Sequence, residues 1–209
     1  MEYWLGGIDS KSSGAELAPS VEELQKWFGP SREVDKHIRA NFGSDFKKLD
    51  RGLYRTWTED HDGRLAAIIL YDQFARSLFR KTPKAYAYGK RAERIAQRAI
   101  ALDVVKEYRY MAQCFLLLPL VHAESRELGN LAVAEMENVK KRVKFDSASI
   151  AQGFNFNLYV RAARKNNETI QKFGRDPHRN AVLKRESTPA ELEYLEAAEK
   201  EEKEQKLNV

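Results

Sequence analysis

The stretch that most constrains the fold runs from Leu65 to Arg80 and reads LAAIILYDQFARSLFR. Its first seven residues are apolar, which is too short for a membrane span but suits a helix buried on every side. In its second half, Asp72, Gln73, Arg76 and Arg80 recur at helical spacing and form one polar stripe. A buried charge must be paired within the protein or must contact a ligand or water. This stripe therefore predicts either an internal ion pair between Asp72 and Arg76 or the floor of a polar pocket.

The composition favours one helical domain. The chain has 209 residues, of which 43% are hydrophobic, and such a chain can bury one core. Only the ambiguous run GFNFNLYV resembles the alternation of a strand. We therefore predict an all-α fold of about eight helices, mostly in antiparallel pairs joined by short loops. We expect a short N-terminal segment and linker at 1–19, a helical domain at 20–198 and a charged, frayed tail at 199–209.

Helix boundaries are marked by capping and breaking residues. Ser20 and Glu23 predict a capping box for a helix that ends at Phe28. A second helix is expected over 31–42, closed by Gly43, with a separate helix following at 44–53.

Later boundaries follow the same signals. The apolar run 108–118 predicts a central helix, interrupted by Pro119. Thr188 starts the last helix, which Leu192 and Leu195 are expected to anchor.

Cysteine usage and hydropathy suggest a compartment. The single cysteine, Cys114, cannot form an internal disulfide, so a reducing interior, cytoplasmic or mitochondrial, is expected. The apolar run from Cys114 to Val121 contains a proline and is too short for a membrane span. The amino terminus shows no signal peptide.

Basic residues are unevenly distributed along a chain of net charge +5. The segment 160–186 has a surplus of lysine and arginine that could attract phosphates or carboxylates. A helix expected over 82–102 has a basic face that includes Lys90, Arg91 and Arg94, but no glycine or aromatic residues are interleaved with it. We interpret that face as ordinary helix surface, not as a nucleic-acid site.

Four blocks of sequence resemble a known family. In order, they are WFGPSREVDKHIRANFG, GRLAAIILYDQFARSLFRKTPKAYAY, LPLVHAES and IQKFGRDPHRNAVLKRESTPAELEYL. They are similar to the signature of the domain of unknown function 924 family, and the match covers nearly the whole chain. The resemblance implies a helical fold like that of tetratricopeptide-repeat proteins, although no 34-residue repeat is visible here. Since the biochemical function of that family is unknown, the resemblance does not identify an activity.

The resemblance also points to a set of polar positions. They are Asp72, Gln73, Arg76, Arg80, His122, Glu124, Arg175, His178, Arg179, Asn180 and Arg185. The chain departs from the family pattern elsewhere, with Asn166 in place of a usual histidine and Gly89 in place of a common aspartate. If relatives need those two groups for catalysis, this chain keeps the fold without the activity.

The abundance of arginine in this set favours an anionic ligand. The planar guanidinium suits bidentate binding of phosphate or carboxylate. We expect a pocket for an anionic small molecule, or for a carboxylate- or phosphate-bearing group. Its expected ligand-binding residues are Asp72, Gln73, Arg76, Arg80, Arg175, Arg179, Asn180 and Arg185.

Two alternatives stay open, one an enzyme and the other not. His122, Glu124 and His178 are candidates for acid–base chemistry in a hydrolase or lyase, although no nucleophile stands at a fixed spacing from them. The chain could instead be an accessory subunit that binds protein partners in a larger, mitochondrial assembly. We expect no metal or cofactor, because no HExxH or paired CxxC motif is present and arginines repel cations.

Overall fold

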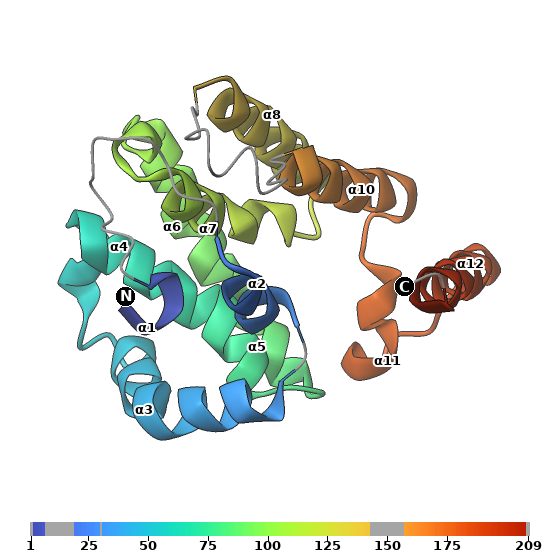
Figure 1. The fold of residues 1–209 in the computed structure, drawn as a ribbon, viewed down its shortest axis with the longest axis horizontal. Helices are drawn as coiled ribbons and strands as arrows, with labels where there is room; N and C mark the ends of the chain where they lie inside the picture. Colours follow the sequence, from blue (N-terminus) through green and yellow to red (C-terminus); the bar gives the residue numbers. More distant parts are fainter. Residues whose placement is uncertain (1, 7–18, 30, 143–156, 208–209) are drawn as a thin grey trace.

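The computed structural model describes residues 2–6, 19–29, 31–142 and 157–207, and in this part all regular structure is helical (Figure 1). The predicted all-α, single-domain fold is therefore confirmed. The longer helices are α2 (Val21–Phe28), α3 (Arg32–Asp50), α4 (His61–Ile68), α6 (Gly89–Ala101), α7 (Tyr110–Val121), α8 (Arg126–Arg142), α10 (Asn157–Phe173) and α12 (Pro189–Leu207). The short elements are α1 (Glu2–Leu5), η1 (Arg55–Thr58), η2 (Ile69–Phe74), α5 (Ala75–Leu78), η3 (Pro83–Tyr86), η4 (Val105–Glu107), η5 (Pro177–Arg179) and α11 (Asn180–Leu183).

Helix α7 lies at the centre of the core. All of its residues are buried, and it packs against α4, α6 and α8. The expectation that Pro119 interrupts this helix was wrong, because α7 continues through it to Val121. An interior proline removes one hydrogen bond of the helix and crowds the carbonyl four residues earlier, but burial of the apolar side chains on both sides of Pro119 outweighs this cost.

Helix α3 corrects another predicted boundary. It runs unbroken through Gly43, where the sequence predicts the end of one helix and the start of another. Its buried residues Ile38, Phe46 and Leu49 face the core along one helix. A glycine costs a helix about 1 kcal/mol relative to alanine, which this continuous apolar contact outweighs.

The stretch from Leu65 to Arg80 is not one regular α-helix. It consists of α4, the π-helix η2 and α5, and the backbone N–H of Ala75 donates to the carbonyl of Leu70, five residues earlier. Both Asp72 and Gln73 lie in the π-helix, and both are buried. Short π-helical turns occur often at functional sites, so this irregularity draws attention to the two polar residues.

The first turn of the chain belongs to the core. Trp4 and Leu5 of α1 are buried, and the indole N–H of Trp27 in α2 donates to the Trp4 carbonyl at 2.6 Å. The capping box predicted for α2, with Ser20 and Glu23, is present. This contact brings α1 and α2 together beside the π-helix.

The C-terminal elements lie at one edge of the molecule. Figure 1 shows α11 and α12 beyond α10, away from α3 and α4. Helix α12 begins at Pro189, as predicted, and extends to Leu207. Leu192 does not anchor it, since that side chain is 50% exposed, whereas the neighbouring Glu191 is only 2% exposed. No helix in the described ranges has the length and apolarity that crossing a bilayer requires.

Candidate functional site

Asp72 is a buried carboxylate with three side-chain partners. Gln73 Nε2 donates to Oδ2 at 2.5 Å, Arg76 Nη2 donates to Oδ1 at 3.3 Å, and His122 Nδ1 lies 2.9 Å from both oxygens. The ion pair between Asp72 and Arg76, one of the two alternatives given for this polar stripe, is thus present. Burial alone would raise the pKa of Asp72, but His122, Arg76 and Gln73 outweigh it and hold that pKa well below its usual range.

His122 follows the last turn of α7 and is oriented by Asp72. Burial, reinforced by the nearby Arg76 cation, lowers the pKa of His122, so the imidazole is neutral at pH 7. Because an ionised carboxylate only accepts hydrogen bonds, Nδ1 carries the imidazole proton. The other ring nitrogen, Nε2, is then unprotonated and can accept a proton.

A small cavity of about 270 Å³ lies between α1, α2 and the η2–α5 segment. We call it the basic pocket, because its charged lining residues in the described part of the chain are all cations, namely Lys26, Arg76 and Arg80. Its uncharged polar lining residues are Gln73, Ser77 and His122, and its aromatic ones are Trp4, Trp27 and Phe28.

The three cations differ in their partners. Arg80 binds Asp35 through two bonds, at 2.5 and 2.6 Å. Burial raises the pKa of Asp35, but hydrogen bonds from Arg80 and Ser77 and the nearby positive charge lower it by more. Lys26 donates to the Tyr3 backbone carbonyl at 2.8 Å, and burial lowers its pKa despite the opposing effect of Glu23.

A second polar cavity, of about 330 Å³, lies on the other side of Arg76 and His122. Arg76 and Arg179 both approach the ring of Tyr86 there, at 5.4 and 4.9 Å from its centroid. Its described lining carries as many acids as bases: Asp72, Glu93 and Glu124 against Arg76, Lys90 and Arg179. We call it the charge-balanced pocket, because its own carboxylates neutralise its cations.

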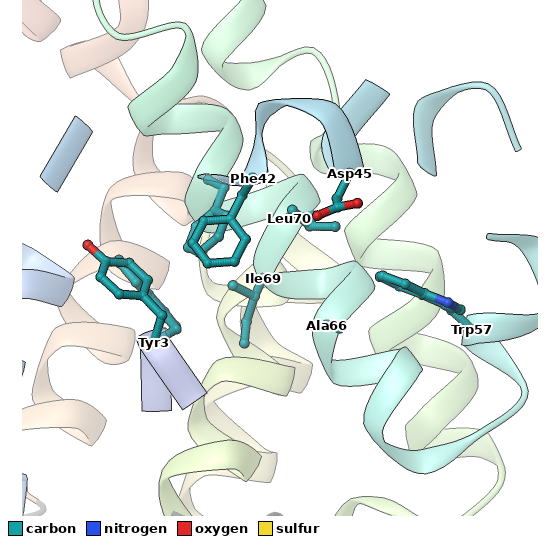
Figure 2. Close-up of a pocket in the computed structure, with 9 residues that line it drawn as sticks. Tyr3, Phe42, Asp45, Trp57, Ala66, Ile69 and Leu70 are labelled. Carbon is teal, nitrogen blue, oxygen red and sulfur yellow. The ribbon is translucent and has the colours of Figure 1, made fainter. Parts of the chain in front are cut away.

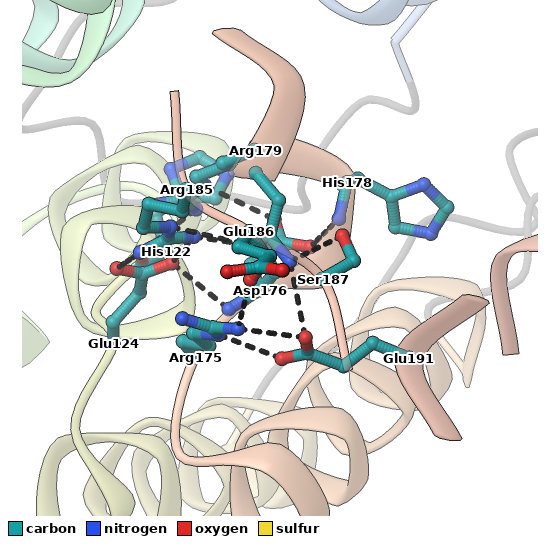
Figure 3. Close-up of polar contacts among 11 residues, drawn as sticks. His122, Glu124, Arg175, Asp176, His178, Arg179, Arg185, Glu186, Ser187 and Glu191 are labelled. Atoms are coloured by element: carbon teal, nitrogen blue, oxygen red, sulfur yellow. Dashed lines mark hydrogen bonds and ion pairs between the residues drawn. The ribbon is translucent and has the colours of Figure 1, made fainter. Parts of the chain in front are cut away.

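The remaining arginines of the set belong to a network of ion pairs (Figure 3). Arg175 binds Glu191 through two bonds, at 2.6 and 2.7 Å. Arg185 binds Glu124 in the same way, at 2.7 and 2.8 Å. Hydrogen bonds from Arg175 and from the Thr188 backbone lower the pKa of Glu191 to about 2. Each guanidinium is therefore held by its own carboxylate.

Asn180 and Arg179 connect this network to the rest of the molecule. Asn180 accepts from Arg185 at 2.9 Å and donates to Glu191 at 3.2 Å, so it bridges the two pairs. Arg179 binds Asp176 at 3.0 Å and donates to the His122 backbone carbonyl at 2.9 Å. These contacts dock the C-terminal segment against the end of α7.

His178 lies apart from the other candidates. It is exposed, its ring meets Tyr194 edge-on with centroids 5.7 Å apart, and Figure 3 shows it pointing away from the network. It lines a different cavity from those that His122 lines. The structure thus separates the two histidines that the sequence analysis considered together.

The predicted site residues fall into two groups. Gln73, Arg76, Arg80 and His122 meet at the basic pocket, whereas the C-terminal residues Arg175, Asn180 and Arg185 form the ion-pair network. Sequence reasoning missed Lys26 and Ser77 in the basic pocket, and Asp35 as the partner of Arg80. No signal in the sequence pairs Asp35 with Arg80, because only tertiary packing brings α3 and the turn after α5 together.

Another cavity, of about 220 Å³, is largely hydrophobic (Figure 2). Phe42, Trp57 and Ile69 line it, and so does Asp45, whose carboxylate accepts a hydrogen bond from Tyr54 at 3.0 Å. No predicted site residue lines it among the described positions. No cluster of three His, Cys, Asp or Glu side chains suited to a metal ion occurs in the described ranges.

These features define a class: a single all-helical domain with a polar site where a π-helix meets the end of a central apolar helix. The chain belongs to the family described as bacterial protein of unknown function, DUF924, whose model matches residues 1–199. The family resemblance predicted from the sequence is therefore confirmed. A protein of unknown function from Agrobacterium tumefaciens has a similar structure, with 29% identity and a TM-score of 0.71 over 83% of this chain and 89% of that one. No curated protein matches this chain.

Proposed function

We propose that this protein binds a small anionic molecule in the basic pocket. The observation that carries the proposal is the charge of the lining, where Lys26, Arg76 and Arg80 are the charged groups among the described residues. Asp72 and Asp35 neutralise the two arginines. Glu23, the acid that acts on Lys26, is engaged in the α2 capping box. None of these three acids is among the described residues that line the pocket, so the charge presented to its interior is positive and favours an anion.

The donors in this pocket suit a carboxylate or a phosphate. Arg76 binds Asp72 through Nε and Nη2, and Arg80 binds Asp35 through the same two atoms, so Nη1 of each guanidinium lies outside these bonds. Hydrogen bonds from charged donors to an anion are roughly twice as strong as neutral ones. Gln73 and Ser77 supply neutral polar groups that could orient the ligand.

The proposal is tested by measuring thermal unfolding and heats of binding with inorganic phosphate and with small carboxylates. At a hundred times its dissociation constant, a ligand adds about 2.7 kcal/mol of stability, which raises the melting temperature. Lys26→Gln and Arg80→Gln should each weaken binding about tenfold, the loss expected for one charge-assisted hydrogen bond. Lys47→Gln and Arg91→Gln are matched controls, because Lys47 is exposed and Arg91 pairs with Asp50 outside the pocket.

Two results would count against this function. One is the absence of any stabilisation by millimolar phosphate or carboxylates at low salt. The other is an equal loss of binding in the pocket variants and in the two controls, which would mean that the anion binds nonspecifically.

A second candidate function, a hydrolase, is favoured by the pairing of His122 with Asp72. In this reaction Nε2 of His122 takes a proton from a water molecule, which attacks an ester or phosphoester, and the proton then passes to the leaving group. General-base catalysis of this kind contributes about 10²- to 10⁴-fold in rate. The neutral imidazole and its carboxylate partner at 2.9 Å support this role.

Turnover of a panel of esters and phosphoesters tests the hydrolase. His122→Gln should lower kcat by about 10²-fold or more, whereas substitution of the exposed His178 by Gln should leave it unchanged. The rate should rise with pH through the lowered pKa of His122, since the unprotonated ring is the base. A panel without turnover, or equal losses in both variants, argues against this reaction.

A further inference from the structure

A larger cavity, of about 900 Å³, adjoins the basic pocket. It is lined by α2 along its whole length, the end of α7, Met136 of α8 and the first half of α10, and we call it the apolar cavity. Its described lining carries no charged residue, and Val21, Leu24, Leu118, Met136 and Leu158 form much of its wall. Its volume lies within the range of roughly 300–1,000 Å³ seen for sites that bury small organic ligands.

Several large side chains around this cavity are exposed. Val21 is 68% exposed, Phe28 is 52% exposed and Leu158 is 61% exposed. All three line the apolar cavity. A cluster of exposed apolar side chains around a concave site is unfavourable in water and marks a surface that an apolar group covers.

The apolar cavity and the basic pocket share part of their walls. Phe28, Gly29 and His122 line both. The cations lie on one side of these shared residues and the apolar walls on the other, so a single molecule lying past Phe28 would meet both environments.

We propose that the occupant is a soluble anionic amphiphile, with a carboxylate or phosphate head in the basic pocket and an apolar chain in the apolar cavity. This inference rests on the anion-binding function proposed above and adds the chemical class of the ligand. Lys26, Arg76 and Arg80 bind the head, whereas Leu118, Met136 and Leu158 contact the chain. A free amphiphile fits better than a membrane surface, because the cations line a recess of about 270 Å³.

Calorimetric titration of the full chain with three probes tests this inference. The probes are acetate, dodecanol, and dodecanoate below its micellar concentration. Dodecanoate should bind at least about a hundredfold more tightly than acetate, because each buried methylene adds to the affinity. Dodecanol should bind more weakly than dodecanoate, because it lacks the charge that the basic pocket recognises.

Two substitutions of alanine by phenylalanine test whether the apolar chain of the ligand binds in the apolar cavity. Ala162 is an exposed residue that lines the apolar cavity, so Ala162→Phe should weaken dodecanoate binding at least tenfold and leave acetate binding unchanged. Ala134→Phe, at an exposed position of α8 outside the cavity lining, is the matched control and should change neither. Far-ultraviolet circular dichroism checks that both variants keep the helical fold.

Different failures have different meanings. If acetate and dodecanoate bind equally, or if Ala162→Phe leaves dodecanoate binding unchanged, the amphiphile inference is overturned while the anion site stands. If neither acetate, phosphate nor dodecanoate binds, both proposals fail. Binding to anionic phospholipid vesicles without binding of monomeric dodecanoate would overturn the free-amphiphile inference in favour of a membrane surface.

Discussion

Asp72 keeps its charge at a position that water hardly reaches, because its side chain is 2% exposed. Three neighbours make this ionisation tolerable: a histidine, an arginine and a glutamine. Buried ion pairs often contribute little net stability, but removing one partner is costly. The arrangement therefore orients His122 more than it stabilises the fold.

The pKa shifts of these two residues predict how stability depends on pH. The lowered pKa of His122 means that the unfolded chain binds a proton more readily, so stability should fall as the pH drops below about 6.5. The lowered pKa of Asp72 predicts a further loss as the pH drops below about 3.9. Urea unfolding measured from pH 8 to pH 3 follows the whole of the first loss and the beginning of the second.

Single substitutions test whether His122 causes the loss of stability near pH 6. His122→Gln should remove the part of the pH dependence that lies near pH 6, whereas substitution of the exposed His178 by Gln should keep it. If the profile of His122→Gln matched that of the unsubstituted chain, this account of the imidazole would be wrong.

At the scale of elements, the helices meet closely where glycines allow it. Gly63 lies in the first turn of α4, beside η1. A Cβ atom at Gly63 would lie 2.6 Å from the carbonyl oxygen of Trp57 and 2.7 Å from its Cα. These are backbone atoms, so the clash could be relieved only by moving an element. Gly43 in α3 has no such neighbour within 4 Å.

This contrast predicts opposite effects for the same substitution. Gly63→Ala should lower the free energy of unfolding by about 1–3 kcal/mol, because overpacking moves η1 away from α4. Gly43→Ala should raise it by up to about 1 kcal/mol, because alanine favours the helix and meets open space. Chemical denaturation of both variants measures the difference. A stabilised Gly63→Ala would show that η1 and α4 do not pack as described.

At the scale of the whole molecule, the C-terminal segment is a peripheral unit. It joins the body through α10, and α11 and α12 lie at the edge in Figure 1. Glu124, at the turn before α8, accepts two bonds from Arg185 and one from the Asp176 backbone. Burial raises the pKa of Glu124, but hydrogen bonds from Arg185 and the backbone N–H of Asp176 lower it by more, so Glu124 stays ionised at neutral pH.

We expect Glu124→Gln to loosen this unit without unfolding the core. Hydrogen exchange should become faster at the amides of residues 175–207, and the amides of α7 should keep their protection, because local opening exposes only the peripheral unit. Glu168→Gln, at an exposed position of α10, is the control. Equal acceleration in α7 would mean that the C-terminal unit and the core unfold together.

Local patterns in the chain were enough to predict the helical class, the capping box at Ser20 and the start of α12 at Thr188 and Pro189. The ion pair between Asp72 and Arg76 was one of the two alternatives that they left open, because both residues lie on the same short stretch of helix. Local signals misplaced the boundary at Gly43 and the break at Pro119. In both helices, burial of the apolar residues on either side of the breaking residue outweighed that residue's own preference.

Packing between distant segments decided the partner of each charge and the walls of each cavity. Arg80 pairs with Asp35, Arg185 pairs with Glu124, and Lys26 lines the same cavity as Arg76. Spacing along a chain relates residues within one helix, since its periodicity is regular. It does not relate residues on different helices, whose relative placement depends on how all the apolar faces pack together. The tertiary structure alone therefore divided the predicted arginines between a basic pocket and a neutral ion-pair network.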